Sequence, residues 1–161
     1  MGQSALEQTK KKDIHIYILS VMSLHNELLA YVIKKEFSSP VKLIEHIDHI
    51  PRENDNKQNI NFLLIDCLKF SFEYVLKHIT VSLSDYNSSN YIAIFNLNYG
   101  TGVEKIALGK HITGFFYKND NLNMVIKGIE KILQGDIWIS RDILTEFAYS
   151  NIKLKLDYIQ K

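Results

Sequence analysis

Short apolar segments alternate with longer helical stretches along most of this 161-residue chain, and this alternation constrains the fold more than any other feature. The apolar segments are rich in β-branched and aromatic residues, which favour strands. Two of them lack polar alternation over most of their length, as is typical of strands covered on both faces of a parallel sheet. The five segments are residues 14–19, 41–44, 60–65, 91–95 and 114–117.

Three of the intervening stretches have apolar residues at helical spacing. Ser23 is suited to cap the first helix and Gly135 to end the last. The stretches at 51–59 and 103–108 predict only short helices. The periodic apolar residues are Leu24, Leu28, Val32 and Ile33, then Phe72, Val75, Leu76, Ile79 and Leu83, then Leu122, Val125, Ile126, Ile129 and Leu133.

Five strand–helix units within about 120 residues predict an α/β fold with right-handed crossovers. Five strands and this length fit a flavodoxin-like parallel sheet in the order 2-1-3-4-5. A further helix is expected from Ser140, with an apolar face formed by Ile143, Leu144, Phe147 and Ala148. We therefore expect a disordered segment at 1–12, one domain at 13–150 and a tail or linker at 151–161.

Composition excludes several classes of protein. Hydrophobic residues make up 46% of the chain, enough for a core, and one cysteine excludes an internal disulfide framework. A net charge of +1 gives no reason to expect a broad nucleic-acid or membrane surface. No apolar run approaches the roughly 18 residues of a membrane span. We therefore expect a cytoplasmic protein. We expect that it is not an enzyme, because no base, nucleophile and orienting group converge in the sequence. We expect no metal or cofactor.

Two residues at strand ends resemble a known site. Asp66 follows the third apolar segment and Lys118 follows the fifth, so both should lie at the ligand-binding edge of the sheet. An aspartate and a lysine at these positions resemble the receiver domain of bacterial response regulators. The resemblance implies that Asp66 accepts a phosphoryl group and that Lys118 contacts it.

The rest of that phosphorylation pocket is missing. A receiver has an acidic pair after its first strand to hold Mg²⁺, whereas this chain has Ser20, Val21, Met22 and Ser23 there. Asn96 stands where a receiver has serine or threonine. We interpret the pocket as degenerate. Asp66 is then a strand-end polar residue or a helix cap, and Lys118 is solvated or paired with Asp66.

The single tryptophan and one of two arginines fall in one tetrapeptide, Trp138-Ile139-Ser140-Arg141, at the predicted start of the sixth helix. An indole plane beside a guanidinium suits guanine, which can stack and accept a forked pair of hydrogen bonds. A helix start with a serine hydroxyl can donate to phosphate. Together these groups suit a cyclic dinucleotide.

The segment from Leu133 to Arg141 resembles the junction before helix six in the VpsT/CsgD subfamily of LuxR-type biofilm regulators. The resemblance implies that cyclic di-GMP binds at residues 138–141. Trp138 would stack, Ser140 would contact phosphate and Arg141 would hold guanine, while Ile139 departs slightly from the usual residue. It also implies a homodimer through helix six. We expect DNA binding only through a helix-turn-helix domain that this chain does not contain.

The resulting hypothesis is a degenerate receiver domain of a transcriptional regulator that senses cyclic di-GMP and dimerises through helix six. Two alternatives stay open, a phosphoacceptor receiver at Asp66 and a ligand-free dimerisation domain. For the tetrapeptide, the alternative is that Trp138 packs on the sheet edge, Ser140 only caps a helix and Arg141 pairs with an acid such as Asp136.

Overall fold

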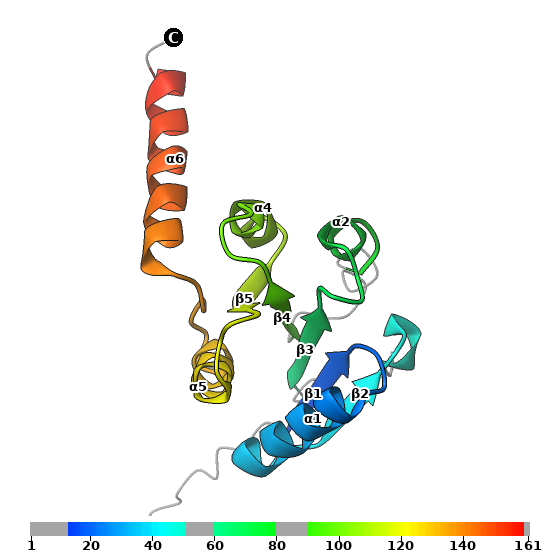
Figure 1. Cartoon of the computed structure of the whole chain (residues 1–161). Helices are drawn as coiled ribbons and strands as arrows, with labels where there is room; N and C mark the ends of the chain where they lie inside the picture. The colour runs from blue at the N-terminus through cyan, green and yellow to red at the C-terminus, as the bar shows by residue number, and fades with distance from the viewer. Residues whose placement is uncertain (1–12, 51–59, 80–89, 160–161) are drawn as a thin grey trace, which may run out of the picture.

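The computed structural model describes residues 13–50, 60–79 and 90–159. Its five parallel strands form one sheet in the order β2-β1-β3-β4-β5, which confirms the predicted fold and strand order (Figure 1). The strands are β1 (Ile14–Leu19), β2 (Val41–Ile44), β3 (Ile60–Asp66), β4 (Asn90–Leu97) and β5 (Ile112–Tyr117). The helices are α1 (Leu24–Phe37), η1 (Ile47–His49), α2 (Phe72–Tyr74), η2 (Val75–Ile79), α4 (Val103–Leu108), α5 (Leu122–Leu133) and α6 (Arg141–Ile159). The expectations for residues 1–12, 51–59 and Leu83 lie outside the described part of the chain.

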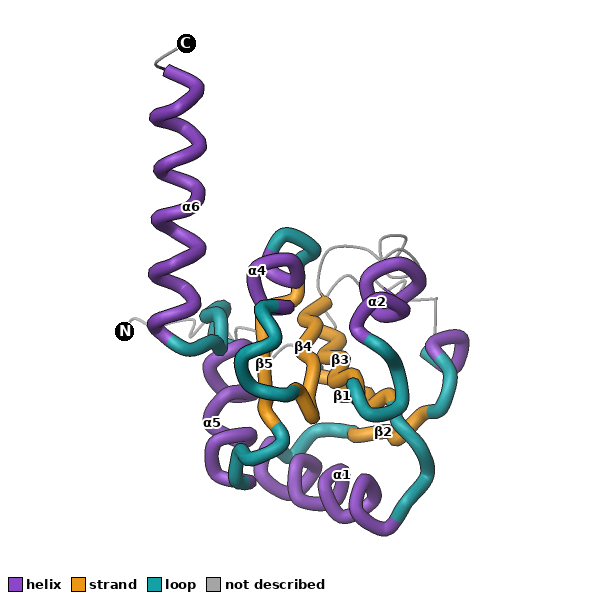
Figure 2. The backbone as a smooth tube through the Cα atoms, turned by 45° about the horizontal axis from the view of Figure 1, so that its top comes forward, coloured by secondary structure: helices purple, strands orange, loops and turns teal. Residues whose placement is uncertain are grey.

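The sheet divides the core into two apolar clusters, one on each face. Because side chains alternate across a strand, Ile16 and Ile18 of β1 enter one cluster, while Tyr17 and Leu19 enter the other. Helices α1 and α5 cover the first face, and α2 and α4 cover the second (Figures 1 and 2). Burial on both faces explains why the strand segments are almost continuously apolar.

The helix boundaries follow local signals in the sequence. The Ser23 side chain accepts a hydrogen bond from Asn26 N at the start of α1, which confirms the predicted cap. Gly135 has φ 93° after α5, and its N–H donates to the Ile132 carbonyl at 2.9 Å. A residue without Cβ adopts this conformation easily, which explains why α5 ends there.

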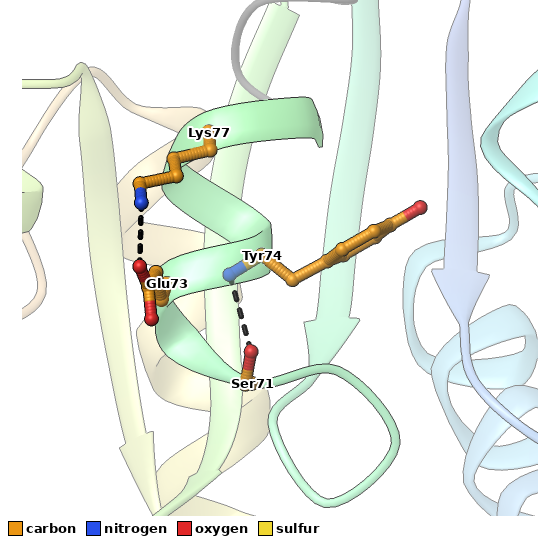
Figure 3. A network of polar contacts seen from close by, with 4 residues as sticks. All are labelled: Ser71, Glu73, Tyr74 and Lys77. Carbon is orange, nitrogen blue, oxygen red and sulfur yellow. Dashed lines mark hydrogen bonds and ion pairs between the residues drawn. The ribbon is translucent and has the colours of Figure 1, made fainter.

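The predicted helix after β3 is less regular than its periodicity suggests. It starts as α2, where Ser71 Oγ accepts from Tyr74 N at 3.2 Å (Figure 3). The Glu73 carboxylate and the Lys77 ammonium pair at 2.5 Å one turn apart. From Val75 to Ile79 the helix is π-type, and both of these end residues are buried in the core.

Helix α6 leaves the compact part of the domain and projects away from it (Figures 1 and 2). None of its described residues is buried. It touches α4, where the Lys105 ammonium lies 2.9 Å from the Glu146 carboxylate. The helix runs to Ile159, through most of the segment expected to be a tail. Among the described helices, none is long and apolar enough to cross a membrane.

Candidate functional site

The Asp66 carboxylate is surrounded by neutral donors. It lies at the end of β3 and is 3% exposed. Ser20 Oγ, at the end of β1, donates to Asp66 Oδ2 at 2.5 Å. Asn96 Nδ2 and Leu68 N donate to Oδ1, each at 2.9 Å. Asn26 Nδ2 in turn donates to Ser20 Oγ at 2.8 Å, so the hydroxyl is fixed in this role.

Asn96 reaches Asp66 through an irregularity in β4. Its φ is 59°, a left-handed conformation that asparagine tolerates better than most residues. The pairing of β4 with β5 shifts register between Ile94 and Leu97. A bulge of this kind re-aims a side chain, and here it directs the amide at Asp66.

Lys118 does not contact Asp66. The residue is exposed at the end of β5, and within the described part of the chain its ammonium forms no ion pair or hydrogen bond. Of the two interpretations of Lys118, solvated or paired with Asp66, the structure supports the solvated one. Asp66 behaves as a strand-end residue that also accepts from the turn at Leu68.

The edge does not fit a receiver's Mg²⁺ ion. Magnesium prefers oxygen ligands that include carboxylates. After β1 the chain offers Ser20 and Val21, and the Ser20 hydroxyl is already committed to Asp66. No group of three or more potential metal-ligating side chains is found among the described residues.

Cys67, next to Asp66, packs against the core cluster on the α2 and α4 face. Burial and the neighbouring Asp66 charge raise the pKa of its thiol to about 12. The thiol is therefore protonated at neutral pH, as expected of a core residue and not of a nucleophile.

The segment between α5 and α6 is held at the edge of the sheet. Trp138 N donates to the Thr113 carbonyl at 2.8 Å, and Phe115 N donates to the Trp138 carbonyl at 3.0 Å. These bonds form a parallel bridge between Trp138 and Gly114 of β5. Trp138, the first residue of the predicted ligand tetrapeptide, is thus held against the edge strand β5.

The Trp138 indole is half-buried against α5 and β5. Its ring lies 6.5 Å from that of Phe116, with an interplanar angle of 27°. Trp138 Cδ1 would lie 2.9 Å from a Cβ added to Gly128, so only glycine leaves room for the indole there. One part of the alternative, that Trp138 packs on the sheet edge, is therefore correct.

Ser140 and Arg141 differ in their contacts with the rest of the domain. Ser140 Oγ accepts from Ile143 N at 3.3 Å, so the residue caps α6 as predicted. Arg141, the first residue of α6, is exposed. It has no ion pair with Asp136 or any other residue that the structure describes.

The tetrapeptide forms one wall of a pocket of about 580 Å³ at the carboxyl edge of β4 and β5. Trp138, Ile139 and Ser140 contribute to this wall, whereas Arg141 does not line it. The opposite walls come from the loops after β4 and β5, and include Tyr99 and Lys118.

Tyr117 lines this pocket and is held in place by α4. Its hydroxyl donates to the Glu104 carboxylate of α4 at 2.6 Å, and Glu104 is 2% exposed. Burial, followed by this hydrogen bond and the Glu104 charge, raises the Tyr117 pKa well above its usual range. The Tyr117 ring also contacts the Tyr99 ring, with centroids 5.4 Å apart.

Several residues of the two sites were missed by sequence reasoning. Ser20 and Asn26 were not expected to hold Asp66, and Tyr99 was not expected beside the tetrapeptide. Only their places directly after strands, or in the first turn of the following helix, could have indicated them, because the sheet brings strand ends together.

Comparison with known proteins agrees with the fold of the domain. The structure is similar to the crystal structure of the master biofilm regulator CsgD regulatory domain, with TM-score 0.65, 18% identity and coverage of 84% of this chain and 98% of that chain. It is also similar to a response regulator from Thermotoga maritima, with TM-score 0.58, 9% identity and coverage of 76% and 98%. The comparison with curated proteins gave no match. The family model described as VpsT-like, receiver domain, matches residues 18–141, and the chain belongs to this family of receiver domains.

Proposed function

We propose that this receiver domain senses cyclic di-GMP at the junction of α5 and α6 and forms a homodimer through α6. One observation carries the proposal. Trp138 and Ser140 form a wall of the pocket, and Arg141, which has no ion pair within the described chain, begins the helix beside it.

The groups present match the chemistry of this ligand. Cyclic di-GMP carries two guanine bases and two phosphates. The Ser140 hydroxyl uses a lone pair for Ile143 N, so its proton is available to a phosphate oxygen. The Arg141 guanidinium can fork onto guanine O6 and N7 or stack on the base. The exposed part of the Trp138 indole offers an apolar surface to the same ligand.

The dimer would use the apolar side of α6 that faces away from α4. A stripe of apolar residues at spacings of three and four runs along the helix, and most of them are strongly exposed. Ile143 and Phe147, nearer to α4, are instead half-buried. The stripe consists of Leu144, Ala148, Ile152, Leu156 and Ile159.

Calorimetric titration with cyclic di-GMP tests the binding site. We expect micromolar or tighter binding by the unchanged protein. Arg141→Ala should raise the Kd about tenfold or more, the size expected for loss of a charge-assisted contact. Lys127→Ala, which removes an exposed cation of α5 that does not line the pocket, is the matched control and should bind normally.

Two results would contradict the proposal. Absence of heat at micromolar protein would exclude the ligand, and equal binding by Arg141→Ala would exclude this site. A dimer mass in light scattering that does not respond to the nucleotide would favour the ligand-free dimerisation domain.

A further inference from the structure

Lys118 lies at the carboxyl ends of the strands and has no ion-pair partner among the residues that the structure describes. Both oxygens of the Asp66 carboxylate already accept hydrogen bonds from neutral groups, including Ser20 Oγ and Asn96 Nδ2. The Lys118 ammonium is exposed and lines the pocket beside Trp138. An uncommitted cation in an aromatic pocket can hold an anion such as a phosphate.

Tyr99 is the most exposed aromatic side chain of the same pocket. It is 74% exposed on the loop after β4, while the Trp138 indole is partly covered by Phe116 and Gly128. The Tyr99 ring rests against the Tyr117 ring, which is itself fixed by Glu104. It is therefore a supported aromatic surface with solvent access, as base stacking requires.

We infer that the pocket between these loops is a second part of the nucleotide site, in which Lys118 binds a phosphate and Tyr99 stacks on a guanine. This inference rests on the proposed function and adds two residues to it. With Arg141 beside the pocket for a guanine and Lys118 inside it for a phosphate, the site supplies one cation for each kind of group in a cyclic dinucleotide. Lys118 occupies the position of the receiver lysine that contacts a phosphoaspartate, and here it contacts a bound phosphodiester instead.

The acidic residue of the pocket is hydrogen-bonded to the backbone of β5. Asp120 also lines the pocket, but its Oδ2 accepts from Tyr117 N at 2.8 Å. This bond holds the carboxylate toward the backbone of β5. Asn98 and Asn119, both exposed in the pocket, offer further neutral donors to the ligand.

The test measures cyclic di-GMP affinity of Lys118→Met and Tyr99→Leu by calorimetry and by the emission of Trp138, the only tryptophan. We expect each variant to raise the Kd about tenfold, from loss of one charge-assisted contact or one stacking contact. Tyr99→Phe, which keeps the ring, should bind within about twofold of the unchanged protein. The controls are Lys110→Met, just before β5 at the amino-terminal ends of the strands, and Tyr31→Leu, exposed on α1. They make the same changes away from the pocket and should leave the Kd unchanged.

The outcomes separate this inference from the proposed function. If Arg141→Ala weakens binding but Lys118→Met and Tyr99→Leu bind like their controls, the second subsite is wrong and the proposed function stands. If the unchanged protein does not bind the nucleotide, both are wrong. Because Lys118 and Tyr99 are exposed, the variants should unfold at the temperature of the unchanged protein, and a circular dichroism melt checks this.

Discussion

At the scale of single residues, Asp66 is a buried carboxylate whose hydrogen-bond donors, within the described part of the chain, are all neutral. It is 3% exposed, and a buried charge is costly unless hydrogen bonds compensate it. Here Ser20, Asn96 and Leu68 N supply those bonds, and no buried side-chain polar atom in the described part of the chain lacks a partner. The hydrogen bonds of this carboxylate therefore join the carboxyl ends of β1, β3 and β4.

Ser20→Ala tests this role. Without the hydroxyl, Asp66 Oδ2 loses its donor in a buried place, so the free energy of unfolding should fall by about 1–3 kcal/mol. Urea denaturation measures the change. Ser150→Ala, which removes an exposed hydroxyl from α6, should cost about 0.5 kcal/mol or less. Equal stability of both variants would mean that the hydrogen bond to Asp66 contributes little.

Cys67 gives a prediction that depends on pH. Because its pKa is raised to about 12, against an ordinary value of about 8.5, the folded protein keeps the thiol proton when an unfolded chain would lose it. This contribution to stability is present below pH of about 8.5 and is lost as the pH rises toward 12.

The same shift predicts slow labelling. At pH 8 a disulfide reagent such as dithionitrobenzoate should react with the native thiol about a thousandfold more slowly than in urea, because the thiolate is the nucleophile. The absorbance of the released thionitrobenzoate follows the reaction, and the single cysteine makes the signal specific. Rapid labelling of the native protein would contradict the raised pKa.

At the scale of elements, the junction between α5 and α6 combines structural and proposed ligand-binding roles. The backbone of Trp138 extends the sheet beside β5, and Ser140 caps α6. A cap and a phosphate contact both use the Ser140 hydroxyl. A substitution that keeps one role and removes the other can separate them.

Ser140→Asp makes that separation. Aspartate is as good a cap as serine and its charge is favourable at a helix start, so helicity and stability should be kept. A carboxylate in the pocket wall should repel the phosphates of cyclic di-GMP and raise the Kd by about tenfold or more. Far-ultraviolet circular dichroism and calorimetry measure the two effects. Unchanged affinity would leave Ser140 with the capping role only.

At the scale of the whole molecule, α6 is a long helix that the domain itself leaves uncovered. Its 19 residues include none that is buried, and a helix with this much apolar surface is stabilised mainly by packing. The Lys105–Glu146 pair is exposed on both sides, so it orients the helix and contributes little stability. A second copy of α6 would cover the stripe that begins at Leu144.

Ile152→Asp tests this arrangement. Ile152 lies in the middle of the stripe and is 53% exposed, so a carboxylate there should prevent dimerisation while leaving the domain folded. Light scattering in the presence of cyclic di-GMP should give the mass of a monomer. Ser150→Asp places the same charge on the polar side of α6 and should keep the dimer. A dimer of the Ile152 variant would place the interface elsewhere.

The sequence by itself determined the elements, because their signals are local. Apolar runs, helical periodicity and single capping residues such as Ser23 act within a few positions, and their alternation implies a parallel sheet with its ligand edge at the strand ends. The same local signals placed Trp138 and Ser140 at a helix start, and the structure agrees.

Only the tertiary structure decided how the polar residues at that edge are paired. Asp66 receives its donors from Ser20 and Asn96, which are 46 and 30 residues away in the chain. The positive φ of Asn96 comes from a register shift between two strands, and no local pattern predicts it. Lys118 has no ion-pair partner in the described part of the chain and lines the pocket instead of contacting Asp66. Hydrogen-bond partners depend on distances that the packing of the whole sheet sets, so the residue types could not determine them.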